Sequence, residues 1–495
     1  MDKVERWDVY EISLKGPESC NPFKDVKISA WFKTGHNKIC VAGFYDGNGI
    51  YKIRFSPDLE GEWEWTTLSN VSELTGKEGK FLCVPPSGKN HGPVVVDKTY
   101  HFRYADGTFY SCIGTTSYAW IHQNESLIKE TLKSLSESPF NKIRMTIFPK
   151  HYEYNENEPE HYVFPVIKRG DSFWNGWGNY EIINSWKFDY SKFDLDFFKM
   201  LDLRLKALCD LNIQADLILF HPYDRWGFSN LDEETAVFYL EYLIARVSSF
   251  RNVWWSLANE FDFMYNKNDA WWDMIGSVIR KNDPYHRMIG IHNGARWFDH
   301  TKFWITHASI QTSDFKIPEW RTQFNKPIVI DEMCYEGTVK NGWGNISGRE
   351  LVHRFWTVLV QGGYPGHSEV FWSEDHIMWW NKGGRLKGES VPRIAFLRKI
   401  LESGPQRGVD PCPKDIMLWE TLCWKGPEWI LGYTGVRQPV EVEISLPKDR
   451  VYSLKWIDPW DMTIETRPER LTCTKSSIIV PLPGRPYTAY LLEEI

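Results

Sequence analysis

The pattern of apolar and polar positions changes twice along the chain of 495 residues. Residues 1–85 alternate apolar and polar positions in short runs separated by turn residues, which is typical of antiparallel strands. Residues 86–404 begin with a Pro/Gly-rich linker and continue with apolar, strand-like runs that alternate with amphipathic segments. Residues 405–495 return to short strands and turns. The pattern predicts a multidomain protein, with a central (β/α)8 TIM barrel over 86–404 flanked by two small β-sandwich domains over 1–85 and 405–495.

Eight apolar runs in the central region predict the strands of the barrel. They are Phe109–Gly114, Lys142–Phe148, Ile213–Phe220, Val253–Leu257, Met288–His292, Ile305–Ile310, Ile328–Ile330 and Glu369–Trp372. Amphipathic segments between them predict helices, for example Ser126–Ser136, Phe193–Leu211, Glu233–Ser249 and Ala270–Lys281. The longest loop, Pro149–Trp186, follows the second strand and is rich in Tyr, Trp, Asn and Gly. Because βα-loops lie on the active-site face of a barrel, we expect this loop to form a wall of the substrate site.

Two glutamates stand at the carboxyl ends of two predicted strands. Glu260 lies in SLANEFDF, after the fourth strand, and Glu332 lies in PIVIDEMCYEG, after the seventh. In a barrel of parallel strands, side chains at the strand ends face one another across a single pocket. Two carboxylates about 5 to 5.5 Å apart can serve as the acid/base and the nucleophile of a retaining glycosidase. Taken alone, each glutamate is also compatible with a carboxylate that interacts with the start of the following helix.

Composition and charge narrow the class of partner. Aromatic residues make up 16% of the chain and include 26 Trp, whose flat apolar faces and polar edges suit sugar rings. The formal net charge is -7, without a basic stripe, so we expect no nucleic-acid partner. No run approaches the ~18 apolar residues of a membrane helix, so we expect no membrane association. The charged N-terminal stretch and the scattered cysteines favour a reducing, cytoplasmic location.

Five segments carry a family resemblance, namely GTTSYAWIHQ, NKIRMTIFP, DLILFHPYDRWGF, NVWWSLANEFDF and IDEMCYEG, in this order. Together they resemble the barrel of the apiosidase-like glycoside hydrolases related to clan A, and the flanking regions resemble β-domains that accompany that barrel. The resemblance implies that Glu260 is the acid/base and Glu332 the nucleophile. It also implies a sugar-binding histidine at His221, after the third strand. Gln311 departs from related barrels, which often carry Tyr or His at this position, and the sugar specificity is therefore left open.

Other residues at the strand ends complete the predicted site. Arg144, on the second strand, is a candidate charge partner that keeps the nucleophile ionised, or else a member of a buried structural ion pair. Asn259 is expected to bind the sugar hydroxyl next to the anomeric carbon. Asp224 accompanies His221 in the same segment, and the alternative for that histidine is a core position. Trp372, at the end of the eighth predicted strand, is a candidate floor under the sugar or a residue that closes the barrel.

Three functions fit these features. The first is a retaining glycoside hydrolase that cuts an oligosaccharide or glycoside from one end and needs no cofactor. The second is a carbohydrate-binding protein that no longer turns over, and the third is a transglycosylase that uses the same residues. We expect no metal site, because His292, His300 and His307 lie near strands five and six without ligand spacing, and no Gly-x-Ser-x-Gly elbow indicates a serine hydrolase. The flanking domains are expected to support the barrel or to supply a loop to its pocket, and a homo-oligomer is left open.

Overall fold

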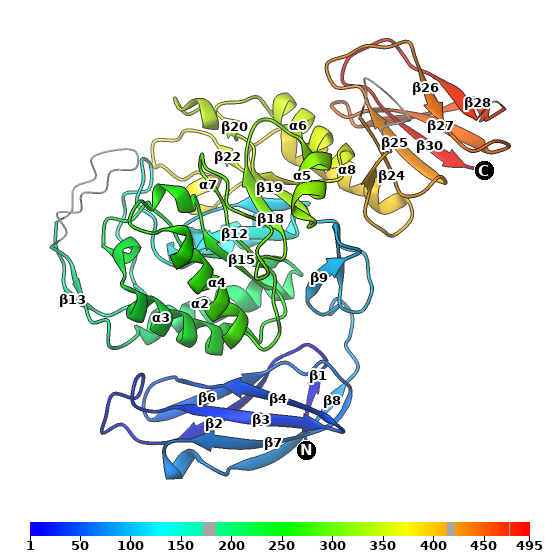
Figure 1. Cartoon of the computed structure of the whole chain (residues 1–495). Helices are drawn as coiled ribbons and strands as arrows, with labels where there is room; N and C mark the ends of the chain where they lie inside the picture. Colours follow the sequence, from blue (N-terminus) through cyan, green and yellow to red (C-terminus); the bar gives the residue numbers. More distant parts are fainter. Residues whose placement is uncertain (172–184, 413–420, 475) are drawn as a thin grey trace.

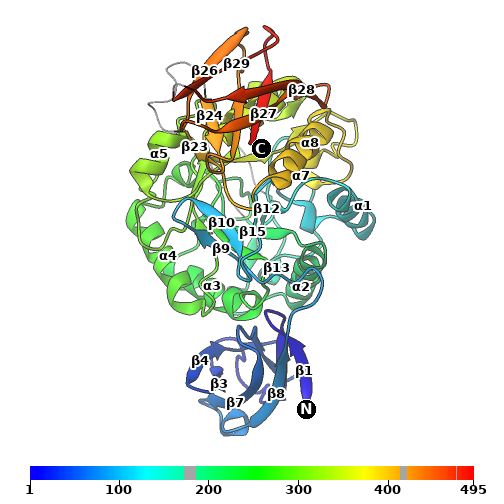
Figure 2. The same ribbon diagram turned by 90° about the vertical axis from the view of Figure 1, so that its right-hand side faces the viewer.

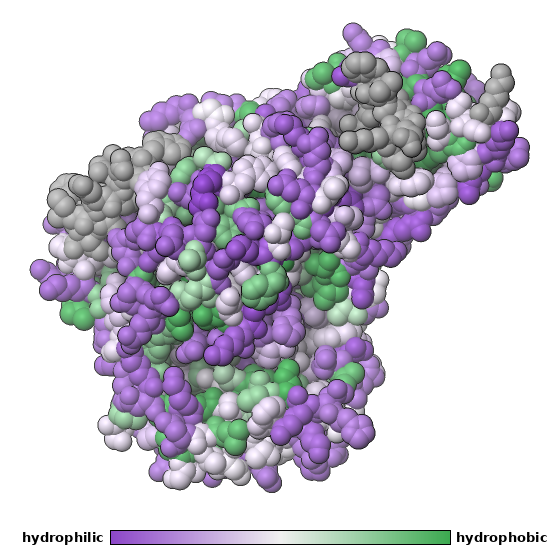
Figure 3. Space-filling model, in the orientation of Figure 1, coloured by the Kyte–Doolittle hydropathy of each residue, from purple (hydrophilic) through white to green (hydrophobic). Residues whose placement is uncertain are grey.

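The computed structural model describes residues 1–171, 185–412, 421–474 and 476–495. A central barrel lies between two β-rich domains, one formed by each end of the chain (Figure 1, Figure 2). The predicted fold class is therefore confirmed. Hydrophilic residues cover most of the face seen in Figure 3, and hydrophobic side chains there form small separate patches. Within the described ranges, no helix is long and apolar enough to cross a bilayer.

The barrel is a parallel sheet of eight strands. In chain order these are β11 (Gly114–Thr116), β12 (Lys142–Thr146), β15 (Gln214–Phe220), β16 (Val253–Ala258), β17 (Ile289–Gly290), β18 (Ala308–Gln311), β19 (Ile328–Glu332) and β21 (Tyr364–His367). Neighbours in the sheet follow the order β17-β16-β15-β12-β11-β21-β19-β18. A parallel bridge between His292 and Ser309 links the two edges, so the barrel nearly closes. Strands β15 and β16 are buried at every position, as expected when helices cover one face and side chains fill the interior.

A buried lysine ties three strands together inside the barrel. Lys142 of β12 places its Nζ 2.7 Å from Asp216 Oδ2 on β15 and 2.6 Å from Asp331 Oδ1 on β19. The hydroxyl of Ser309 on β18 donates to Asp331 Oδ2 at 2.6 Å. Buried charges are tolerated only when they are paired and hydrogen bonded, and these are. The network fixes Asp331, and therefore the adjoining Glu332, at the end of β19.

Helices surround the barrel. They are α1 (Glu125–Ser136), α2 (Leu195–Asp210), α3 (Glu233–Val247), α4 (Asp269–Asn282), α5 (Ile317–Phe324), α6 (Gly348–Val360), the short α7 (Trp379–Lys382) and α8 (Ser390–Ser403). The first four correspond to the four helices that the sequence predicts. Side chains that accept a backbone N–H of the first turn cap α1, α2, α3, α4 and α6, namely Asn124, Asp194, Asp232, Asn268 and Ser347. These caps fix where each helix begins and so how long the preceding βα-loop is.

The prediction of the last barrel strand is wrong. That strand is β21, whereas the predicted run contributes only β22 (Glu369–Val370), which pairs with β20 (Glu336–Gly337) in a separate two-stranded sheet. The sequence of β21, YPGH, contains a proline and a glycine that favour turns, so its pattern does not indicate a strand. Gly366 is needed there, because an added Cβ would lie 2.7 Å from the carbonyl oxygen of Asp331. The first barrel strand also differs from the prediction: it is β11 (Gly114–Thr116), which begins at the last residue of the predicted run Phe109–Gly114.

The N-terminal domain is a sandwich of two sheets that packs against α2 and α3. Its strands are β1 (Asp2–Glu5), β2 (Tyr10–Lys15), β3 (Ile28–Thr34), β4 (Asn37–Ala42), β5 (Phe44–Tyr45), β6 (Ile50–Phe55), β7 (Gly61–Ser69) and β8 (Glu78–Val84). They form sheets of order β1-β8-β7-β3-β4 and β2-β6-β5 around one apolar core. Arg54 pairs with Asp202 of α2 at 2.8 Å, and Asp46 pairs with Arg246 of α3 at 2.8 Å. The hairpin of β9 (Val94–Asp97) and β10 (His101–Tyr104) then packs on residues near the amino ends of the barrel strands.

The C-terminal domain packs against α5 and α6. Its strands are β23 (Asp410–Pro411), β24 (Thr421–Trp424), β25 (Trp429–Tyr433), β26 (Glu441–Ser445), β27 (Val451–Asp458), β28 (Thr463–Thr472), β29 (Ser477–Pro481) and β30 (Ala489–Glu494). They form sheets of order β23-β24-β25-β30-β27-β28 and β26-β29. Asp410 accepts hydrogen bonds from Arg321 of α5 and from His101, and the Tyr433 hydroxyl lies 3.0 Å from Nδ1 of His353 in α6. These contacts attach the domain to the side of the barrel.

Candidate active site

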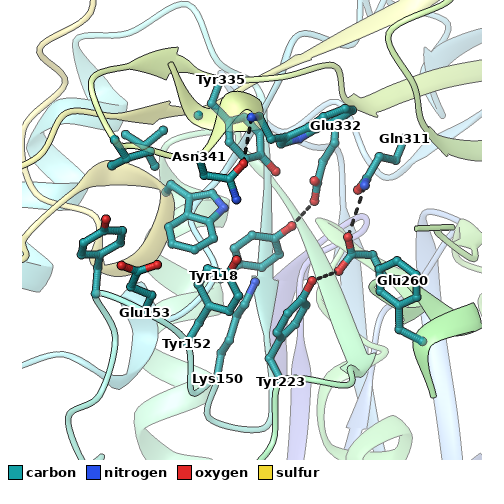
Figure 4. Close-up of a pocket in the computed structure, with 17 residues that line it drawn as sticks. Tyr118, Lys150, Tyr152, Glu153, Tyr223, Glu260, Gln311, Glu332, Tyr335 and Asn341 are labelled. Carbon is teal, nitrogen blue, oxygen red and sulfur yellow. Dashed lines mark hydrogen bonds between the residues drawn. The ribbon is translucent and has the colours of Figure 1, made fainter. Parts of the chain in front are cut away.

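A cavity of about 340 Å³ opens at the carboxyl ends of the barrel strands. Aromatic side chains form much of its wall, namely Tyr118, Tyr152, Tyr154, Tyr223, Phe263, Tyr335, Trp343 and Trp380. Glu260, Glu332 and Lys150 point into it from three different strand ends (Figure 4). Its lining comes from the barrel, and no described residue of either flanking domain contributes to it. The loop after β12 forms one wall of the cavity through residues 150–154, as expected. The same loop contains β13 (Val166–Lys168) and β14 (Lys187–Phe188), and its residues 172–184 lie outside the described ranges.

Glu260 follows β16 in a turn with left-handed backbone geometry (φ 50). Its carboxyl accepts hydrogen bonds from the Tyr223 hydroxyl, from Asn259 Nδ2 at 3.1 Å and from Gln311 Nε2 at 3.2 Å. Burial, followed by the negative charge of Glu332, raises the pKa of Glu260 to about 7, although Lys150 opposes the rise. A substantial share of Glu260 is therefore protonated near neutral pH.

Glu332 is the last residue of β19 and is also buried. Its Oε1 accepts hydrogen bonds from Arg144 Nη1 at 3.2 Å and from the Tyr118 hydroxyl. Burial alone would raise the pKa of Glu332, but the interactions with His292 and Arg144, together with the Tyr118 hydrogen bond, outweigh burial and hold the pKa below its usual value. Because burial lowers the pKa of His292 to about 3, that ring is neutral near pH 7, and Arg144 supplies the permanent positive charge. Glu332 is therefore ionised when Glu260 is protonated.

Asn259 connects the two carboxyl groups. Its Oδ1 accepts from Arg144 Nη2 at 3.1 Å and lies 3.0 Å from the Tyr118 hydroxyl oxygen, while its Nδ2 donates to Glu260. The network orients both acids, but it also occupies the amide that was expected to bind a sugar hydroxyl. Neither Asn259 nor Arg144 lines the cavity, so both support the carboxyl groups from behind.

Three predicted sugar-binding residues lie elsewhere. His221 is buried with Nε2 3.2 Å from the Phe148 carbonyl oxygen, and burial lowers its pKa to about 3. The Asp224 carboxylate accepts the backbone N–H groups of the following loop, including that of Trp226 at 2.8 Å. Both side chains stabilise the loop after β15 instead of lining the cavity. Trp372 is 53% exposed beyond β22 and does not line the cavity, whereas Trp380 of α7 does.

Gln311 lies in the cavity wall as expected, and sequence reasoning missed several other lining residues, among them Tyr118, Tyr223, Lys150 and Trp380. Tyr118 and Tyr223 donate to the two glutamates, and each follows a predicted strand within a segment that carried the resemblance. Lys150 follows β12 by a few residues, so its position near the end of that strand could have identified it as a lining residue. Trp380 had no such signal, because it belongs to a short helix far past the last strand.

The described residues contain no group of three or more His, Cys, Asp or Glu side chains arranged to hold a metal ion. His292, His300 and His307 are each buried, and burial lowers the pKa of each to about 3. Their rings are therefore buried and neutral near pH 7.

Comparisons with known proteins agree with this geometry. The family described as "Apiosidase-like, catalytic domain" matches residues 97–405, and two domains of unknown function, DUF5060 and DUF5605, match residues 3–70 and 419–493. A solved structure titled a "putative glycoside hydrolase" from Bacteroides vulgatus is 36% identical, with 100% of both chains covered and a TM-score of 0.93. A glycoside hydrolase family 5 structure from Bacteroides vulgatus shares the fold, at 14% identity and a TM-score of 0.59 over 82% of this chain and 94% of that one. No curated protein matches the chain. The chain thus belongs to the apiosidase-like catalytic domain family of glycoside hydrolases, as its sequence segments predicted.

Proposed function

We propose that the chain is a retaining glycoside hydrolase that works by double displacement, with Glu260 as acid/base and Glu332 as nucleophile. One observation carries the proposal: two buried carboxyl groups on one aromatic-walled cavity have pKa values shifted in opposite directions. A glycosidase needs this difference, because one group must deliver a proton while the other attacks as an anion.

In the first step, a carboxylate oxygen of Glu332 bonds to the anomeric carbon as the bond to the leaving oxygen breaks. The proton of Glu260 passes to that leaving oxygen. In the second step, the ionised Glu260 takes a proton from water, the water oxygen bonds to the anomeric carbon, and Glu332 is released. Arg144 and Tyr118 both donate to Oε1 of Glu332, an arrangement that suits attack through Oε2.

We also propose that the enzyme removes sugar from one end of an oligosaccharide or glycoside. The loop after β12 contributes Tyr152 to the cavity, and the loop after β19 contributes Trp343. Glu153 and Lys340 join these two loops through an ion pair of 2.8 Å at the rim. A rim bridged in this way favours entry by a chain end over passage of a continuous polymer.

A reducing, cytoplasmic location remains part of the proposal. All nine cysteines are free thiols, and six of them are buried. Proteins of oxidising compartments more often pair their cysteines. A short imported oligosaccharide or glycoside would then be the substrate.

Product stereochemistry tests the mechanism. Aryl pyranosides and furanosides would be incubated with the enzyme, and the first-formed anomer would be followed by ¹H NMR. Retained configuration is expected. Inverted product would exclude double displacement, and the absence of any product would favour a binding protein.

A further inference from the structure

Lys150 presents a single amine to the cavity from the loop after β12. The residue is only 5% exposed, and its Nζ lies over the ring of Tyr118 at 3.4 Å and near that of Tyr223 at 4.2 Å. Trp380 lies 4.9 Å from the same atom. Figure 4 shows the amine between the rings of Tyr118 and Tyr223, directed toward the space between the two glutamates. The side chain is thus held by ring faces, which attract a cation.

No described residue accepts a hydrogen bond from this amine or forms an ion pair with it. A buried lysine without a counter-ion is costly, because desolvation disfavours the charged form. Burial lowers the pKa of Lys150 to about 7, even though the charges of Glu260 and Glu332 oppose the shift. An amine that is not hydrogen bonded to any described residue, and that points into the cavity, has the position expected of a ligand-binding group.

Two of the three acidic residues in the described cavity lining have ion-pair partners other than Lys150. Glu332 is paired with Arg144, and Glu153 is paired with Lys340. Glu260 receives hydrogen bonds from neutral groups and is protonated during the first chemical step. Among the described lining residues, Lys150 is the one with a basic side chain. When Lys150 is protonated, the described cavity wall therefore presents one ammonium group to a bound ligand.

We infer that Lys150 binds the carboxylate of an acidic sugar, so that the substrate of the proposed glycosidase is a uronide. A single amine suits a carboxylate better than a phosphate dianion, which usually recruits several donors or cations. The carboxylate also stabilises the charged form of Lys150 and the protonated form of Glu260. An acidic sugar thus prepares the acid/base for its first step, and this consequence rests on the proposed function.

Binding of free monosaccharides tests the inference without requiring turnover. Calorimetric titration at pH 6 would compare glucuronate, galacturonate and mannuronate with glucose, galactose and mannose, and glucose 6-phosphate would be included. At least one hexuronate should bind about tenfold more tightly than its neutral counterpart. This preference should weaken severalfold at pH 8, where Lys150 loses its proton.

Three variants locate the effect. Lys150→Met should abolish the preference, and Lys150→Arg should retain most of it, which separates loss of charge from loss of structure. Lys316→Met is the matched control, since Lys316 follows β18, is 53% exposed and pairs with Asp314. Equal binding of neutral and acidic sugars, no binding of any hexuronate, tighter binding of glucose 6-phosphate, or a preference that survives Lys150→Met would each overturn the inference. If hexuronates bind but no glycoside is hydrolysed, the proposed function fails and the acidic-sugar site stands.

Discussion

Arg144 and Glu332 form a buried ion pair beside the cavity, with Nη1 of the guanidinium 3.2 Å from Oε1 of the carboxylate. Arg144 comes from β12 and Glu332 from β19, so the pair joins two strands that are not neighbours in the sheet. The guanidinium also lies 4.0 Å from Asp331 and donates to Asn259. One cation therefore both orients the predicted nucleophile and keeps it ionised.

Replacing Arg144 should move the acid limb of the pH–rate profile. In Arg144→Met the positive charge is lost, so the pKa of Glu332 rises and activity disappears at a higher pH than in the wild type. We expect kcat to fall by about 10²-fold, because a preorganised charge contact is removed. The measurement is kcat/KM from pH 3.5 to 8. An unchanged acid limb would show that Arg144 does not set the ionisation of the nucleophile.

Activity should also decline as pH rises through about 7, where Glu260 loses the proton that it must donate. Glu260→Gln should abolish this alkaline limb and lower kcat/KM on a glycoside with a poor leaving group by about 10² to 10⁴-fold. A dinitrophenyl glycoside needs little protonation, so its first step should suffer much less. Equal losses on both substrates would argue against general acid catalysis by Glu260.

The hydrogen bond from Tyr223 lowers the pKa of Glu260. The Tyr223 hydroxyl donates to Glu260 and favours the ionised carboxylate, so Tyr223→Phe should raise the pKa of Glu260 and move the alkaline limb to higher pH. Tyr239→Phe is the control, because Tyr239 is buried outside the cavity and no described residue bonds to its hydroxyl. The two profiles would be compared with the wild type. A shift of the same size in both variants would mean that the Tyr223 hydrogen bond has no specific role.

Lys142 should be essential for stability. Lys142→Met leaves the Asp216 and Asp331 carboxylates buried without their shared cation, and we expect the free energy of unfolding to fall by about 3 to 5 kcal/mol. The exposed pair of Lys206 and Asp210 provides the comparison, since Lys206→Met should cost at most about 1 kcal/mol. Urea unfolding followed by circular dichroism measures both. Similar losses in the two variants would contradict a special role for the interior network.

The sequence was sufficient to predict the barrel and the location of Glu260 and Glu332 at its carboxyl end. Both follow from the same rule, because side chains that directly follow buried strands must point into the carboxyl end of the barrel. Gln311, at the end of β18, was found in the same way, whereas Arg144 was predicted on the second strand itself, and both contact a glutamate. The sequence left two roles open for Arg144: charge partner of Glu332, or member of a buried structural ion pair. The structure combines the two roles, because the ion pair between Arg144 and Glu332 is itself buried.

This rule fails in two situations: where the position of the strand is predicted wrongly, and where the chain turns directly after the strand. Trp372 was assigned to the cavity because β21 has no apolar pattern, and the wall is completed instead by Trp380, which belongs to α7. His221 and Asp224 directly follow β15, but their side chains bond to loop backbone atoms and leave the wall to Tyr223 between them. Such choices depend on side-chain direction within a loop, which periodicity does not encode.

The central claim is that Glu332 is the nucleophile and Glu260 the acid/base, and trapping of the covalent intermediate tests it most directly. The enzyme would be incubated with 2-deoxy-2-fluoro glycosides that carry a dinitrophenyl leaving group, in neutral and uronic acid forms. Intact-mass and peptide mass spectrometry would then locate the attached sugar. The account predicts one fluoroglycosyl group, on the peptide that contains Glu332 and absent from the Glu332→Gln variant. Attachment at Glu260, or turnover with inverted configuration and no adduct, would contradict it.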